Sequence, residues 1–261
     1  MASCPGWKVA VRESCGEASV TWSEGEDVYG EELRRQCAWV RTHRAEGDPI
    51  QGIEWVPIAR ELGSSERACG RARTELIRYI VHNHLRVLWT LTFVEPQFDR
   101  EFVLGCVQRF FTALVKRYPK LPYVYVFEPH KSGALHVHFA SRYIPIWELK
   151  AEWVRASGGV GGRVQFEKRR RWKGKGSPRQ LGKYLGKYIG KDFEAGTPFG
   201  RHRYEVRRGF SPDVVREFRE DFAEAVALVS GLVGQVDWLH YESCFWKDYR
   251  GPTCHKYVWD P

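Results

Sequence analysis

The chain has 261 residues and an excess of basic side chains, with 41 lysines and arginines against 32 aspartates and glutamates. The net charge of +9 attracts polyanions such as nucleic acids, whereas the lack of an N-terminal signal or a long apolar span argues against a membrane protein. The length can bury a substantial core in one or two domains.

From residue 86 onward, the pattern predicts an α+β domain in which helices pack on an antiparallel sheet. The predicted elements in chain order are a strand at 86–93, a helix at 98–118, a hairpin at 123–140, a helix at 146–156, a strand at 163–168, a helix at 178–192, a short strand at 202–207 and a helix at 212–232. Residues 1–84 begin acidic and polar, and then predict helices at 57–62 and 65–82. We therefore expect a helical accessory region at 1–84, a main domain at 85–210, and a C-terminal helix and tail at 211–261 that pack on it.

A pair of histidines lies in the second strand of the predicted hairpin, which we expect at the centre of the sheet. Side chains alternate between the faces of a strand, so His136 and His138 point the same way. Lys131-Ser132-Gly133 suits a three-residue loop with glycine at its left-handed position, and this loop places Glu128 opposite His136. Two imidazoles and one carboxylate suit a divalent ion such as magnesium or manganese, which keeps positions open for substrate oxygens. In the alternative, Glu128 caps the hairpin or pairs with Lys131.

A basic segment with one aromatic ring precedes the next predicted helix. Such a segment can track a phosphate backbone and stack one base, although a solvated basic loop is the plainer alternative. Its candidate DNA-binding residues are Lys168, Arg169, Arg170, Arg171, Trp172, Lys173 and Lys175.

The helix predicted at 178–192 carries two tyrosines one turn apart. Ser177 followed by Pro178 is typical of a helix start. Tyr184 and Tyr188 share one face, between an apolar stripe and a cationic one, and each is followed three residues later by a lysine. Tyrosines at this spacing are also common as residues at the edge of a core.

Three glycines form a separate stripe on the same helix, at Gly182, Gly186 and Gly190. Each lowers helix stability by about 1 kcal/mol relative to alanine. Their retention indicates either the close approach of another backbone or a need for mobility.

The seven cysteines are odd in number and form no tight Cys-x-x-Cys pair, which favours a reducing cytoplasm. Cys4 with Cys15, and Cys244 with Cys254 and His255, can in principle bind zinc across the chain ends. Their spacing does not fit a common zinc finger.

Taken in order, three motifs resemble those of the HUH endonuclease superfamily, named for a His-hydrophobic-His motif. Trp89–Phe93 looks like the first strand motif, Gly133–Phe139 the metal motif, and Tyr184–Lys191 the tyrosine motif. Arg203–Phe210 looks like the segment that follows the tyrosine helix. The resemblance covers about residues 86–210 and is strongest to the two-tyrosine rolling-circle replication initiators of small single-stranded DNA phages and plasmids.

This resemblance implies a metal-dependent endonuclease, with an RRM-like fold, that nicks and rejoins single-stranded DNA at an origin. Tyrosine attack would leave a 5′-phosphotyrosine link and a free 3′-hydroxyl, and the lysines would favour the phenolate or stabilise the transition state. The implied catalytic residues are Tyr184, Tyr188, Lys187 and Lys191, and the implied ligands of magnesium or manganese are His136, His138 and Glu128.

Single-stranded DNA, possibly a hairpin, is the expected partner, together with a host helicase and polymerase; no membrane partner is expected. No phosphate-binding loop of a fused helicase is present in the sequence. The expected location is the cytoplasm of a prokaryotic or phage-infected cell. Two other functions remain open: a two-tyrosine HUH transposase, and a non-catalytic module that binds single-stranded DNA or RNA.

Overall fold

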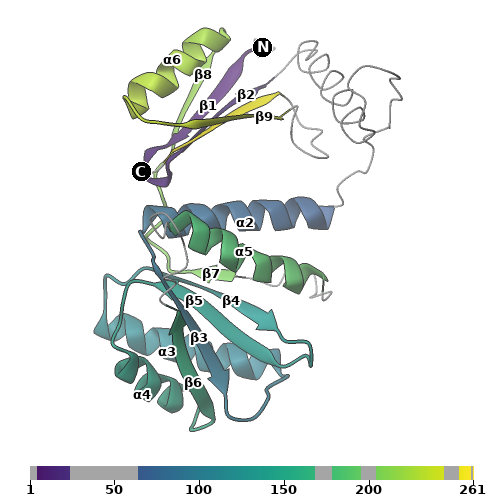
Figure 1. Cartoon of the computed structure of the whole chain (residues 1–261), viewed down its shortest axis with the longest axis vertical. Helices are drawn as coiled ribbons and strands as arrows, with labels where there is room; N and C mark the ends of the chain where they lie inside the picture. The colour runs from purple at the N-terminus through teal and green to yellow at the C-terminus, as the bar shows by residue number, and fades with distance from the viewer. Residues whose placement is uncertain (1–4, 24–63, 168–177, 195–203, 244–252, 260) are drawn as a thin grey trace, which may run out of the picture. The chain divides into compact units, whose positions relative to one another are not determined.

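A computed structural model of the chain describes residues 5–23, 64–167, 178–194, 204–243, 253–259 and 261 (Figure 1). The chain divides into two compact units. One unit is residues 64–211, and the other combines residues 1–63 with residues 212–261.

The 64–211 unit contains a five-stranded antiparallel sheet in the order β6-β3-β5-β4-β7, so the strand with the two histidines is central, as predicted. Its α+β class is also as predicted. The strands are β3 (Val87–Phe93), β4 (Tyr123–Pro129), β5 (Leu135–Ser141), β6 (Gly161–Glu167) and β7 (Tyr204–Val206).

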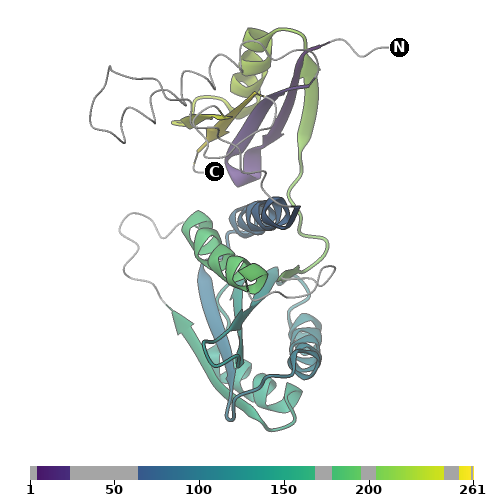
Figure 2. The same cartoon turned by 90° about the vertical axis from the view of Figure 1, so that its right-hand side faces the viewer.

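Four helices cover the two faces of this sheet (Figure 2). They are α2 (Ser64–His82), α3 (Arg100–Arg117), α4 (Ile146–Ala156) and α5 (Pro178–Glu194). Helices α3 and α4 pack over the face that presents Trp89, Phe139 and Val137. Helices α2 and α5 pack over the opposite face, where Val126 and Ala140 lie. Because strand side chains alternate, His136 and His138 share the face of α5.

The hairpin between β4 and β5 has the predicted register. The N–H of His130 donates to the carbonyl of Ala134 at 2.8 Å, which leaves three residues in the loop. Gly133 has a φ of 87°, a left-handed conformation that glycine adopts without strain. The loop therefore sets Glu128 directly opposite His136.

The glycine stripe of α5 faces α2. A Cβ at Gly182 would lie 3.0 Å from the Cα of Ile77, which confirms the predicted close approach of another backbone. Arg73 extends along the same stripe, and its Nε donates to the carbonyl of Gly186 at 2.9 Å. The small residues thus allow α2 to hold α5 against the sheet.

The second unit contains another five-stranded antiparallel sheet, in the order β8-β1-β2-β10-β9, with α6 packed on it. A short 3₁₀ turn, Glu13–Cys15, joins β1 to β2. The remaining elements are β1 (Trp7–Arg12), β2 (Glu17–Trp22), β8 (Val215–Arg219), α6 (Phe222–Val233), β9 (Leu239–Glu242) and β10 (Cys254–Val258).

The structure corrects the expected division of the chain. Residues 7–22 form strands instead of part of a helical region, and the helix at 64–82 belongs to the 64–211 unit because it packs on α5. Residues 212–261 group with the N-terminal strands instead of with the main domain, because β8 and β10 pair with β1 and β2. The helix predicted at 57–62 lies outside the described residues.

The helix predicted at 212–232 is wrong in its first half. Val215–Arg219 is the strand β8, which pairs with β1. The helix starts only after Asp221, whose side chain accepts a hydrogen bond from the N–H of Glu224 at 3.1 Å. None of the helices in the described parts of the chain has the length and apolarity needed to cross a membrane.

Candidate active site

The two predicted motifs meet on the α5 face of the sheet. Glu128 and His138 are in contact, with 2.5 Å between Oε2 of the carboxylate and Nε2 of the imidazole. His136 lies across the strand pair from Glu128 and presents its ring to His130, with centroids 5.5 Å apart. The three predicted ligands therefore share one face, and two of them touch directly.

The second ring nitrogen of His138 is held by the neighbouring strand. Thr90, which pairs with His138 in the sheet, places its Oγ1 3.0 Å from Nδ1. His138 is buried, with 7% of its surface exposed, so this contact fixes the ring orientation away from bulk water. When Nδ1 carries the proton, Nε2 has a lone pair that is directed to the Glu128 side.

The environment of His136 favours its neutral form. Burial lowers the pKa of this imidazole, and the neighbouring rings of His138 and His130 lower it further, against the opposing effect of Glu128. Since only a neutral imidazole binds a metal ion, this is the form that a ligand requires.

Tyr188 lies directly against the histidine site. Its ring stacks on that of His138, with 4.3 Å between centroids and 9° between planes. Its hydroxyl donates to the hydroxyl of Tyr184 at 2.6 Å, and the two phenol rings are nearly perpendicular. Tyr188 is buried, with 6% of its surface exposed, whereas Tyr184 is half-buried. Both hydroxyls are thus in one hydrogen-bonded pair beside the sheet.

Lys187 adds positive charge next to this pair. The lysine is exposed, and its Nζ lies 5.6 Å from the ring centroid of Tyr184. Lys191 belongs to the last turn of α5, but its side chain lies outside the described residues. So does the whole basic segment 168–175, so the predicted DNA-binding residues have no structural account.

Thr90 is the contact that sequence reasoning missed. The first strand motif, Trp89–Phe93, contains it, and the strand order needed to place it beside His138 is not encoded locally. The available signal was the motif itself, because a threonine in a strand next to a histidine strand can present its hydroxyl to a ring nitrogen.

The comparisons with known proteins bear on the same segment. Residues 86–193 match a family model described as a replication-associated protein of the ORF2 type. This match confirms the resemblance to rolling-circle replication initiators of the HUH type. It runs from β3 to α5 and so includes Glu128, both histidines and both tyrosines. No curated protein matches the chain, and no solved structure matches it.

Proposed function

We propose that the 64–211 unit nicks single-stranded DNA at a replication origin by tyrosine attack, and that it rejoins the strand later in rolling-circle replication. The observation that carries this proposal is the stack of Tyr188 on His138. It brings the tyrosine helix to the strand of the His-x-His motif, within a segment that matches a replication-associated family.

The residues present fit a divalent metal ion. Glu128, His136 and His138 offer one carboxylate and two imidazoles on one face, and the carboxylate already meets Nε2 of His138. This mixed oxygen and nitrogen set suits manganese or magnesium with further positions left for phosphate oxygens. When bound, the ion would withdraw charge from the phosphate that is attacked.

The nicking step forms one bond and breaks another. The hydroxyl oxygen of Tyr184 or Tyr188 attacks the phosphorus, and the bond from phosphorus to the 3′-oxygen breaks. The departing oxygen leaves as a 3′-hydroxyl after it takes up a proton, while the phenol proton passes to the neighbouring hydroxyl or to water. Lys187, next to Tyr184, and Lys191, by its place in the sequence, would stabilise the negative charge that develops.

The rejoining step reverses this chemistry. The 5′-phosphotyrosine link keeps the energy of the original phosphodiester, so a 3′-hydroxyl can attack it and release the tyrosine without a nucleotide cofactor. Two tyrosines allow a second cleavage while the first link persists. Their hydroxyls are 2.6 Å apart, so a small movement of helix or DNA exchanges one for the other at the same phosphate.

The proposal is tested with the full chain, labelled single-stranded DNA and manganese. We expect a covalent protein–DNA adduct whose modified peptide contains Tyr184 or Tyr188, and we expect chelator to prevent it. Addition of a DNA strand with a free 3′-hydroxyl should then release the protein and yield a longer DNA. DNA binding without any adduct, in the presence of manganese, would instead indicate a non-catalytic binding module.

A further inference from the structure

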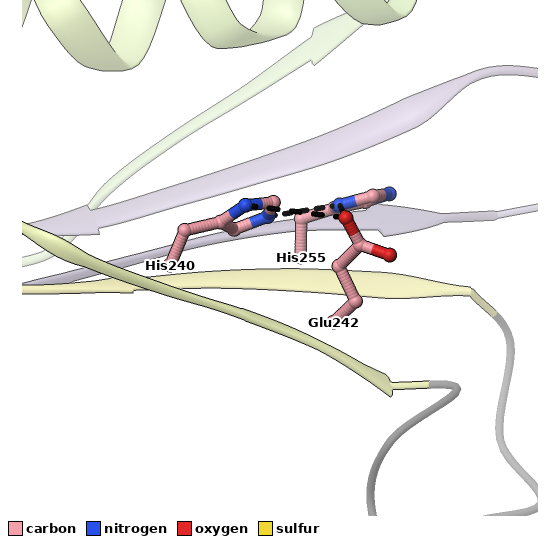
Figure 3. A group of neighbouring side chains, drawn as sticks. All are labelled: His240, Glu242 and His255. Carbon is pink, nitrogen blue, oxygen red and sulfur yellow. Dashed lines mark hydrogen bonds and ion pairs between the residues drawn. The ribbon is translucent and has the colours of Figure 1, made fainter. Parts of the chain in front are cut away.

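Two histidines and a glutamate gather in the other unit, away from any motif of the DNA chemistry (Figure 3). His240 and Glu242 come from β9, and His255 comes from β10. The two strands are antiparallel, with Glu242 opposite His255 and His240 opposite Tyr257. One ligand atom from each of the three lies within 4.8 Å of the others.

The distances match those of a metal-binding group. Nε2 of His240 lies 3.1 Å from Nδ1 of His255, and two nitrogens bound to one tetrahedral zinc ion are about 3.3 Å apart. Oε1 of Glu242 lies 4.0 Å from Nδ1 of each histidine, so a small rotation of its side chain completes a set of three ligands.

The rings are held in place by their neighbours. His255 is buried at 5% exposure, and its ring packs on Trp7 and Phe222 with centroids 5.8 Å and 4.5 Å away. His240 stacks on Tyr257, with 4.7 Å between centroids and 7° between planes. A site whose ligands are oriented by packing needs little rearrangement to bind an ion.

We propose that His240, Glu242 and His255 form a zinc site that ties the edge strand β9 to β10. Two imidazoles and one carboxylate are ligands that zinc takes, with a water molecule in the fourth position, whereas magnesium prefers oxygen ligands. Glu242 and His240 are partly exposed, which leaves an entry path for the ion.

The site has a structural consequence because β9 is short and lies at the edge of its sheet. It spans Leu239–Glu242, is largely exposed and pairs with β10 alone among the described strands. An ion that binds only the folded sheet stabilises it by RT ln(1 + [L]/Kd). Zinc should therefore slow the opening of this edge.

The test uses the full chain with His136→Ala and His138→Ala, which removes the other candidate ligands. After chelator treatment and dialysis, we expect one zinc per chain and a cobalt spectrum of tetrahedral type. His240→Phe, which keeps the ring stack, and Glu242→Gln should each weaken zinc binding by roughly tenfold or more. His84→Asn removes an exposed imidazole elsewhere and serves as the matched control; it should leave zinc affinity unchanged.

A second readout does not depend on affinity. Hydrogen exchange at residues 239–242 should slow on addition of zinc in the parent chain, and it should not change in His240→Phe, while thermal unfolding checks that each variant is folded. Absence of zinc binding in the folded parent chain, or equal binding by the parent and His240→Phe, would overturn the proposal. Such a result would leave a hydrogen-bonded histidine pair without a metal role.

Discussion

The ring of Tyr188 lies face to face with the imidazole of His138, with centroids 4.3 Å apart. One residue comes from α5 and the other from the central strand β5, so the contact joins the tyrosine helix to the histidine motif. Because Tyr188 is nearly buried, its ring both positions His138 and presents a hydroxyl to Tyr184.

Loss of either histidine should abolish nicking and leave DNA binding largely intact. His136→Ala and His138→Ala remove donors for the divalent ion, whereas the attraction of lysines and arginines for phosphate does not need that ion. Cleavage of labelled single-stranded DNA and its retention on a filter measure the two effects separately. Glu128→Ala should be milder, because water can replace a carboxylate. Full cleavage by either histidine variant in chelator would contradict the metal assignment.

Thr90→Val should weaken the metal site without touching a ligand. The substitution keeps the shape of the side chain but removes the oxygen 3.0 Å from Nδ1 of His138. Loss of such an orienting hydrogen bond typically lowers metal affinity by about 10–100-fold. The concentration of manganese that gives half-maximal nicking should rise by a similar factor, and Thr90→Ser should restore it. If valine and serine behave alike, the hydroxyl has no orienting role.

The glycine stripe gives a matched pair of stability variants. Gly182→Ala places a methyl group 3.0 Å from the backbone of Ile77 and should destabilise the 64–211 unit by about 1–3 kcal/mol. Gly70→Ala lies on the partner helix α2 with nothing within 4 Å, and should stabilise it by up to about 1 kcal/mol. Urea unfolding measures both changes. Similar stabilisation by the two variants would show that α2 and α5 do not approach closely in solution.

The basic segment should contribute phosphate contacts. Neutralising Arg169, Arg170 and Arg171 together should weaken single-stranded DNA binding and flatten its dependence on log salt by about 0.7 per lost contact. Neutralising three exposed lysines removes the same charge from the other side of the sheet, and this control should keep the slope; the three are Lys116, Lys120 and Lys150. An unchanged slope in the arginine variant would return the segment to a solvated loop.

Local patterns were enough to predict the main unit. The loop length fixes the hairpin register, so the pairing of Glu128 with His136 followed from Gly133 alone. The start of α5 followed from Pro178, and its close neighbour from the glycines. These features depend on residues that lie near one another in the sequence.

The second unit could not be predicted in the same way. Strand β2 pairs with β10 across more than 200 residues, as in the pair Val20 and His255. Val215 and Phe218 have a spacing that also fits a helix, and only the pairing with β1 decides for a strand. The cluster at His240 was missed for the same reason, because its ligands meet through strand pairing.

Adduct formation by tyrosine variants tests the central claim most directly. Tyr184→Phe and Tyr188→Phe each keep the ring, including the stack on His138, and remove one hydroxyl. With manganese and labelled single-stranded DNA, each single variant should still form a covalent adduct but fail at strand transfer that needs two attacks. The double variant should form no adduct while it binds DNA as the wild type does. An adduct formed by the double variant would contradict tyrosine attack by this pair, and wild-type transfer by one single variant would leave a single nucleophile.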